Sequence, residues 1–177
     1  EEMYWAVSEF GACAGTEITA SHNPINYNGI KIVKSKSQPL DEETDFKVIK
    51  KLAERDNWRG TSNAGLVRDI AIEARSKYVQ RILGFVDVSQ FKPLKIVINS
   101  GNGAAGRTLD AIIDAINEYG VTTKFIRVHH TPDSKFPNGI PNPLLPENWA
   151  ATADVVVREG ADIGVAFDGD FDRCFFF

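Results

Sequence analysis

An acidic cluster in the last ten residues offers the clearest chemistry in this chain. Residues 168–173 read Asp-Gly-Asp-Phe-Asp-Arg and follow an apolar run at 163–167. Alternate residues of an extended segment point the same way, so the three carboxylates can converge on one hard cation. Three unpaired carboxylates would otherwise repel one another and raise their own pKa values. The spacing therefore predicts a Mg²⁺ site formed by Asp168, Asp170 and Asp172.

The acidic cluster has two other interpretations. A solvated acidic turn is the first, because runs of charged residues usually lie in water. The neighbouring apolar run, which is typical of a buried strand, argues against it. An EF-hand is the second, but its loop needs glycine at the sixth position, where this chain has Arg173, and a helix before it. The metal-binding interpretation is therefore preferred.

A second candidate site lies far away, where residues 19–24 read Thr-Ala-Ser-His-Asn-Pro. Short strands are expected at 15–18 and 30–33, and the Asn-Pro and Asn-Gly pairs between them favour turns. Ser21 would then be displayed on a compact loop, as a nucleophile could be. A Ser/His hydrolase is disfavoured, since adjacent residues seldom form a triad and no Gly-x-Ser-x-Gly elbow is present. Taken alone, the segment is typical of a polar turn.

The motifs at 19–24, 28–31 (Asn-Gly-Ile-Lys) and 168–173, in this order, resemble the α-D-phosphohexomutase superfamily. Its members move a phosphoryl group between the C1 and C6 oxygens of a hexose. Residues 136–144 are most similar to the bacterial phosphomannomutase type, which serves GDP-mannose and surface polysaccharide synthesis. The resemblance implies that mannose 6-phosphate and mannose 1-phosphate interconvert through a hexose 1,6-bisphosphate. Phosphoglucomutase, phosphoglucosamine mutase and a non-catalytic phosphosugar- or metal-binding fragment remain as alternatives.

The resemblance also implies roles for individual residues. Ser21 matches the phosphoserine, Lys31 matches the active-site lysine, and His22 matches the neighbour of the phosphoserine. All three residues are expected to be catalytic. A phosphorylated hexose is the implied substrate, and Arg173 and Asn23 are the residues expected to bind it. The implied cofactor is Mg²⁺, with the ligands Ser21, Asp168, Asp170 and Asp172.

Periodicity predicts the elements that position these residues. Helices are expected at 41–55, 69–84, 104–119 and 146–160, and strands at 94–98, 121–128 and 162–167. Strand, helix, strand, helix, strand predicts a parallel α/β sheet, whose ligands gather at the carboxyl ends of its strands, where Asp168 sits. A polar linker is expected at 57–63.

The family is built of four domains, so the resemblance implies an α/β fragment of a multi-domain phosphohexomutase, with mixed or parallel sheets flanked by helices. Residues 1–67 are expected to be the C-terminal part of domain 1, and residues 68–177 a truncated domain 2. The fragment alone is expected to be inactive, because the loops that grip the sugar and the distal phosphate belong to the other domains.

A glycine-rich turn argues for a different kind of protein. Gly101, Gly103 and Gly106 fit the Gly-x-Gly-x-x-Gly pattern of dinucleotide sites. Such a site also needs an acidic residue at the end of the next strand to bind the ribose, and this chain has His129 and His130 there. A structural role for the glycines is therefore preferred. The adjacent histidines are more typical of a polar surface than of a metal site.

Composition limits the function classes further. The chain has 177 residues, 43% of them hydrophobic, and a formal net charge of −4. These values are typical of a soluble globular protein, and the absence of a basic patch with interleaved aromatics disfavours nucleic acid as a partner. No apolar run is long enough to span a membrane, and residues 1–3 lack the positive charge of a signal peptide, so a cytoplasmic protein is expected. Cys13 and Cys174 are expected to be free buried thiols. No motif indicates an oligomeric state.

Overall fold

The computed structural model describes residues 1–55, 60 and 65–177, and the chain forms two compact units. The first unit contains residues 1–17 and 31–74, and the second contains residues 18–30 and 75–177. The predicted linker at 57–63 lies outside the described residues apart from Gly60. The predicted domain boundary after residue 67 stays a prediction.

The first unit is built from short elements. Its helices and strands are α1 (Glu2–Glu9), β1 (Ala14–Ile18), β2 (Ile30–Lys34), η1 (Ser35–Ser37), η2 (Glu42–Phe46) and α2 (Lys47–Glu54), with β1 and β2 forming a two-stranded sheet. Gly15 allows α1 to pack on β1, since a Cβ at this position would lie 2.3 Å from Val7 Cγ2. Asp41 caps the predicted helix at 41–55 by accepting hydrogen bonds from the backbone N–H groups of Glu43 and Thr44.

The second unit holds a four-stranded sheet in the order β4-β3-β5-β6. Strands β3, β4 and β5 are parallel, and β6 pairs antiparallel with β5, so the sheet is mixed as expected. The elements are α3 (Ala71–Leu83, which begins in the first unit), η3 (Val88–Gln90), β3 (Lys95–Asn99), α4 (Ala105–Glu118), β4 (Lys124–Val128), η4 (Pro146–Asn148), α5 (Ala150–Glu159), β5 (Ile163–Phe167) and β6 (Cys174–Phe176).

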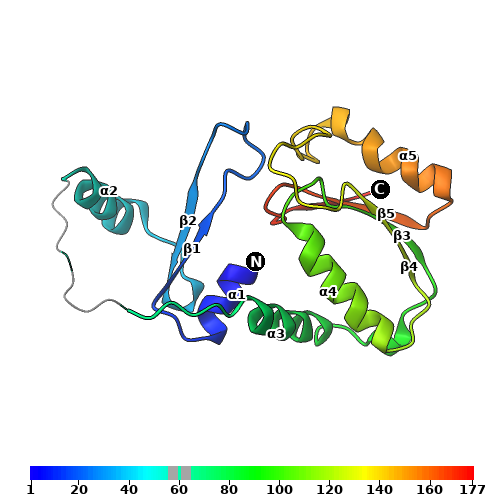
Figure 1. The fold of residues 1–177 in the computed structure, drawn as a ribbon, viewed down its shortest axis with the longest axis horizontal. Helices are drawn as coiled ribbons and strands as arrows, with labels where there is room; N and C mark the ends of the chain where they lie inside the picture. Colours follow the sequence, from blue (N-terminus) through cyan, green and yellow to red (C-terminus); the bar gives the residue numbers. More distant parts are fainter. Residues whose placement is uncertain (56–59, 61–64) are drawn as a thin grey trace. The chain divides into compact units, whose positions relative to one another are not determined.

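The strand order places α4 and α5 on opposite faces of this sheet. The chain moves from β3 outward to β4 through α4, then back across β3 to β5 through α5. Parallel connections are almost always right-handed, and two such crossovers that run in opposite directions are expected to place their helices on different faces. Figure 1 shows α4 and α5 on the two sides of the strands. The central strand β3 is accordingly the most buried, with Val97 0% exposed.

The predicted α/β elements of the second unit are confirmed, with two differences. The strand expected at 121–128 begins only at Lys124, and the helix expected at 146–160 is broken into η4 and α5. The left-handed Gly160 ends α5, as the αL C-cap of a helix requires. The sheet thus brings the carboxyl ends of β3 and β5 side by side, with Ser100 following the first strand and Asp168 the second.

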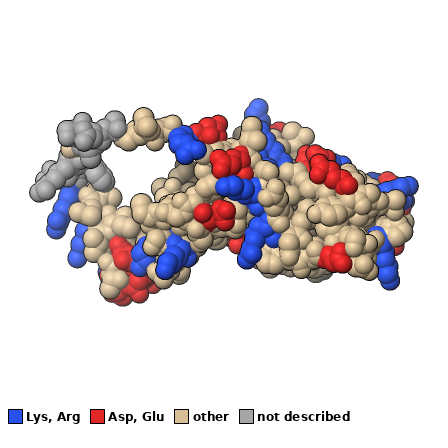
Figure 2. Space-filling view, turned by 90° about the horizontal axis from the view of Figure 1, so that it is seen from below, with Lys and Arg blue, Asp and Glu red and all other residues tan. Residues whose placement is uncertain are grey.

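Side chains of both charge signs are interspersed over the face shown in Figure 2, in keeping with the small net charge of −4. Among the residues that the structure describes, no helix is long and apolar enough to cross a membrane. The expectation of buried thiols is wrong, because both Cys13 and Cys174 are free and exposed. Each follows or precedes a tight turn, where the chain returns to the surface.

Candidate active site

The serine loop, residues 18–30, lies in the second compact unit. The N–H of Thr19 donates to the carbonyl of Gly29 (3.0 Å) and closes the base of the loop. Near the tip, the backbone N–H of Asn23 donates to the carbonyl of Ala20 (3.0 Å). Ser21 has a φ of +53°, a left-handed conformation that residues other than glycine seldom adopt. The loop therefore holds its serine in a specific, strained geometry.

The metal loop, residues 168–173, turns back on itself directly after β5. The N–H of Phe171 donates to the carbonyl of Asp168 (3.1 Å), and Phe171 has a φ of +49°. One carboxylate oxygen from each of Asp168, Asp170 and Asp172 lies within 4.8 Å of the others. The carboxylates converge as the sequence predicted, but they do so because the loop folds into a turn and not because an extended strand aligns them.

The serine and metal loops meet at Ser21. Its Oγ donates to Asp168 Oδ2 (2.9 Å) and accepts from Arg173 Nη2 (2.9 Å), which also donates to Asp168 Oδ2 (2.6 Å). Arg173 Nη2 lies 2.6 Å from His22 Nδ1 as well. The site therefore unites a hydroxyl, an imidazole, a fixed cation and a carboxylate.

Burial sets the electrostatics of the site. The side chain of Asp168 is only 1% exposed. Its desolvation raises the pKa of Asp168 above the usual range, although hydrogen bonds from Ser21 and Arg173 and the positive charge of Arg173 act in the opposite direction. The nearby Asp170 carboxylate raises this pKa further. The ionised form of Asp168 is consequently less stable in the folded chain than in water.

The donor set fits a hard divalent cation. Of the four predicted ligands, the three aspartates offer carboxylate oxygens, the donors that Mg²⁺ prefers, and Asp168 and Asp170 are buried. Asp170 Oδ2 accepts a hydrogen bond from Thr19 Oγ1 (3.1 Å). The other oxygen, Oδ1, is a buried atom that accepts no hydrogen bond from any residue that the structure describes. A cation bound here would offset the cost of burying these charges.

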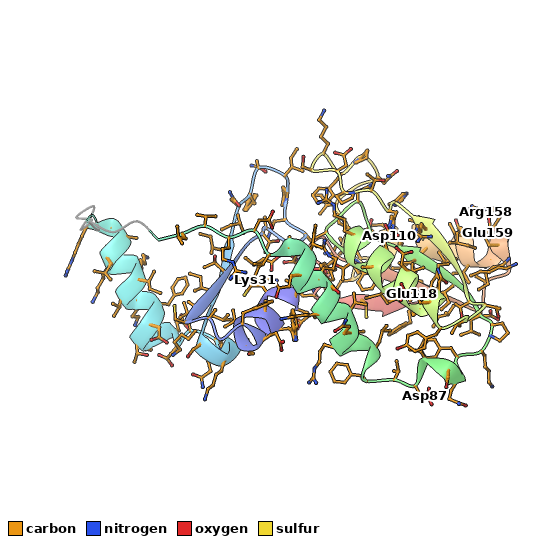
Figure 3. The ribbon with its side chains drawn as sticks, turned by 60° about the horizontal axis from the view of Figure 1, so that its bottom comes forward. Lys31, Asp87, Asp110, Glu118, Arg158 and Glu159 are labelled. Carbon is orange, nitrogen blue, oxygen red and sulfur yellow. The ribbon has the colours of Figure 1, made fainter. Side chains whose placement is uncertain are left out.

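Asn23 and Lys31 are the remaining predicted site residues. Asn23 is exposed, and its Nδ2 donates to the carbonyl of Ala20 (2.9 Å), so its side chain stabilises the turn in this structure. Lys31 is half-buried on β2 and belongs to the first compact unit (Figure 3). The sequence predictions did not include Thr19, although a threonine hydroxyl often accepts a hydrogen bond from the backbone N–H two residues later, as it does here from Ser21.

The structural role predicted for the glycine-rich turn is confirmed. A Cβ at Gly103 would lie 2.5 Å from the carbonyl oxygen of Gly169 in the metal loop. At Gly106 it would lie 2.3 Å from the carbonyl oxygen of His130, and at Gly101 it would lie 2.3 Å from Pro141 Cβ. The N–H of Ala104 donates to the same Gly169 carbonyl (2.9 Å). Gly103 and Gly106 therefore let protein backbone approach, Gly101 lets the Pro141 ring approach, and the turn supports the metal loop.

Comparisons with known proteins agree with this arrangement. Residues 76–177 match the family model described as phosphoglucomutase/phosphomannomutase, alpha/beta/alpha domain II, and residues 1–59 match that of domain I. Over its whole length the chain is 48% identical to a phosphomannomutase of Escherichia coli, of which it covers 39%. It is 44% identical to a phosphomannomutase of Vibrio cholerae, of which it covers 38%.

A solved structure shows the same fold. The crystal structure of a phosphoglucomutase/phosphomannomutase family protein from Burkholderia thailandensis matches 92% of this chain with a TM-score of 0.72 and 29% identity, over 33% of its own length. The chain thus spans well under half the length of the relatives it matches. The family-model matches, which together cover most of the chain, decide its membership. The chain belongs to the phosphoglucomutase/phosphomannomutase family.

Proposed function

We propose that this chain carries the phosphoserine and Mg²⁺ loops of a phosphomannomutase, which interconverts mannose 6-phosphate and mannose 1-phosphate. One observation carries the proposal: Ser21 Oγ lies 2.9 Å from Asp168 Oδ2 and 2.9 Å from Arg173 Nη2, although 147 and 152 residues separate the partners in sequence. A serine hydroxyl is a weak nucleophile, but a phosphoserine can donate its phosphoryl group. The relatives named phosphomannomutase support the choice of mannose.

Ser21 is the group that carries the phosphoryl in this proposal. A hydroxyl oxygen of the sugar phosphate forms a bond to phosphorus while the bond from phosphorus to Ser21 Oγ breaks, and the hydroxyl proton ends on Ser21 Oγ. His22 Nδ1, 3.0 Å from that oxygen, is placed to hold the proton during the exchange. The other phosphate of the resulting hexose 1,6-bisphosphate then returns to Ser21, so the net reaction is an isomerisation.

The charged residues balance the phosphoryl group. Asp168, Asp170 and Asp172 would hold Mg²⁺, which when bound supplies positive charge to the transferring phosphoryl oxygens. Arg173 places a fixed cation against Ser21 Oγ, the atom that gains charge as the bond to phosphorus breaks. We assign Lys31 to the same reaction, and Asn23 and Arg173 to binding of the phosphorylated hexose. Mannose 1-phosphate would feed GDP-mannose and surface polysaccharide synthesis.

Mass spectrometry tests the phosphoserine directly. The full-length protein that contains this sequence is incubated with mannose 1,6-bisphosphate and Mg²⁺, and its intact mass is expected to increase by about 80 Da, the mass of one phosphoryl group, localised to Ser21 by peptide fragmentation. Ser21→Ala should remove the increase, and Ser35→Ala, at an exposed serine of η1, should retain it. Labelling at another residue, or none in the wild type, would contradict the proposal.

The choice of sugar needs a separate assay. Mannose 1-phosphate and glucose 1-phosphate are compared as substrates of the full-length protein that contains this sequence, each with its matching bisphosphate. A higher kcat/KM is expected for the mannose compound. A preference for glucose would leave the phosphoserine chemistry intact and overturn only the substrate assignment.

A further inference from the structure

We propose that Thr19 is a positioning residue that couples the phosphorylated serine loop to the Mg²⁺ ligand Asp170. The inference rests on the proposed function, since it concerns how the serine and the metal ligands are held relative to each other. Thr19 itself contacts neither reacting atom in the proposed reaction. Its hydroxyl instead joins the two loops that carry those atoms, across 151 residues of sequence.

The hydroxyl of Thr19 makes two hydrogen bonds of fixed direction. Its Oγ1 lies 2.8 Å from the backbone nitrogen of Ser21 and 3.1 Å from Asp170 Oδ2. The backbone nitrogen can only donate and an ionised carboxylate can only accept. Thr19 Oγ1 must therefore accept from Ser21 and donate to Asp170, which uses its one proton and one of its lone pairs.

The backbone of Thr19 is held from the other side of the loop. Its N–H donates to the carbonyl of Gly29 (3.0 Å), and a Cβ at Gly29 would lie 2.5 Å from the Thr19 carbonyl oxygen. The close approach of these two residues fixes the point from which the side chain projects. Because a β-branched side chain is restricted at χ1, the hydroxyl has little freedom to leave this position.

Both partners need such a restraint. Ser21 has a φ of +53°, which costs free energy unless its surroundings enforce it, and the bond from its N–H to Thr19 does so. Asp170 is 8% exposed, and the Thr19 hydroxyl fixes which of its oxygens faces the serine loop. Residues that orient metal ligands from outside the coordination sphere commonly affect metal affinity by about 10–100-fold. One hydroxyl thus sets both the serine conformation and the carboxylate orientation.

Calorimetric titration of the 177-residue chain with Mg²⁺ tests the metal side of the proposal. Thr19→Val keeps the shape of the side chain without its hydroxyl and is expected to weaken Mg²⁺ binding about tenfold or more. Thr19→Ser retains the hydroxyl and should restore most of the affinity. Thr16→Val, an equivalent change at an exposed position of β1, should leave the affinity unchanged. Asp170→Asn serves as the reference for loss of a ligand.

Amide hydrogen exchange measured by NMR tests the serine side. The Ser21 amide should be protected in the wild type and in Thr19→Ser, and it should exchange faster in Thr19→Val. If Thr19→Val fails to fold by circular dichroism, Thr19→Ala is used for both measurements. An unprotected Ser21 amide in the wild-type chain would overturn the proposal without any variant.

The outcomes separate this inference from the proposed function. If Asp170→Asn loses Mg²⁺ while the Thr19 variant that folds binds it like the wild type, the role of Thr19 is wrong and the metal site stands. If Asp170→Asn binds Mg²⁺ like the wild type, the metal site itself is wrong and the coupling falls with it. The coupling is supported if Thr19→Val weakens Mg²⁺ binding and speeds exchange of the Ser21 amide, and if Thr19→Ser restores both to near the wild-type values.

Discussion

The second compact unit contains two clusters with the same residue types and opposite burial. The Ser21 site consists of Ser21, His22, Asp168 and Arg173, and the Asp110 cluster consists of Ser100, Asp110, Arg127 and His130. In the Asp110 cluster, His130 Nε2 lies 2.8 Å from Asp110 Oδ2 and its Nδ1 lies 3.3 Å from Ser100 Oγ. Arg127 Nε donates to Asp110 Oδ1 (2.8 Å). Serine, histidine, aspartate and arginine are hydrogen-bonded in both.

Burial distinguishes the two clusters. Ser100 is 0% exposed, whereas the carboxylate side chain of Asp110 on α4 is 45% exposed (Figure 3). In the Ser21 site the serine is half-buried and the Asp168 side chain is 1% exposed. A ligand can therefore reach the hydroxyl of Ser21 but not that of Ser100. The same four residue types carry the proposed phosphoryl chemistry in one place and tie α4, β4 and the β3–α4 turn together in the other.

Replacing the two serines should give the largest contrast. In the full-length protein, Ser21→Ala is expected to lower kcat by about 10³-fold or more, as the loss of a nucleophile does in other enzymes. Ser100→Ala should keep near-normal kcat and lose only about 1 kcal/mol of stability, the net contribution of one hydrogen bond. A coupled assay and thermal unfolding measure both. Comparable losses of activity would break the comparison.

Replacing Asp170 and Asp110 should have different effects on Mg²⁺ affinity. Asp170→Asn removes a carboxylate from the cluster of three and should weaken Mg²⁺ binding at least about tenfold. Asp110→Asn should leave Mg²⁺ binding unchanged, because its carboxylate is already bound to Arg127 and His130. Calorimetry with Mg²⁺ decides between them. Weaker binding in the Asp110 variant would show that the two clusters are coupled.

The elements of the second unit and the Asp168–Asp172 cluster could be predicted because local patterns encode them. Apolar periodicity marks the strands, and alternate carboxylates next to an apolar run mark the metal loop. The hydrogen bond between Ser21 and Asp168 depends on contacts across 147 residues, which no local pattern specifies. His129 and His130, predicted to form a polar surface, are both half-buried. The His130 side chain is 18% exposed, and it is hydrogen-bonded to Asp110 and Ser100, which come from other elements and which no local pattern specifies.

A glycine substitution should sharpen the comparison, since the β3–α4 turn contacts the metal loop and also carries Ser100. In Gly103→Ala the new Cβ would lie 2.5 Å from the Gly169 carbonyl oxygen, and one backbone segment must move. Such overpacking typically costs about 1–3 kcal/mol. Thermal unfolding should therefore show a lower Tm, with weaker Mg²⁺ binding as the metal loop shifts. Gly65→Ala, which has open space around its Cβ, is the control. An unchanged Tm in Gly103→Ala would mean that the turn yields without moving the metal loop.

The smallest effects on Tm should have opposite signs for the buried Asp168 and the exposed Asp110. Burial raises the pKa of Asp168, so folding destabilises its ionised form relative to the unfolded chain. Asp110 is partly desolvated too, but hydrogen bonds from His130 and Arg127 lower its pKa. In the metal-free chain at pH 7, Asp168→Asn is therefore expected to raise Tm and Asp110→Asn to lower it. The loss for Asp110 should stay below about 1 kcal/mol, because water screens its exposed ion pairs.

The pH dependence fixes the sign of each effect. The pKa of Asp168 is raised in the folded state. Its contribution to the free energy of unfolding is therefore most favourable below its ordinary pKa, and it is lost as the pH rises through the folded pKa. A lowered pKa means that Asp110 stabilises above the ordinary value of 3.8 and loses this as the pH falls through the folded value. Both variants should therefore approach the wild-type Tm on acidification, one from above and the other from below. Tm shifts of the same sign for the two variants at pH 7 would show that burial does not distinguish the two carboxylates. The contrast between the two clusters would then be wrong.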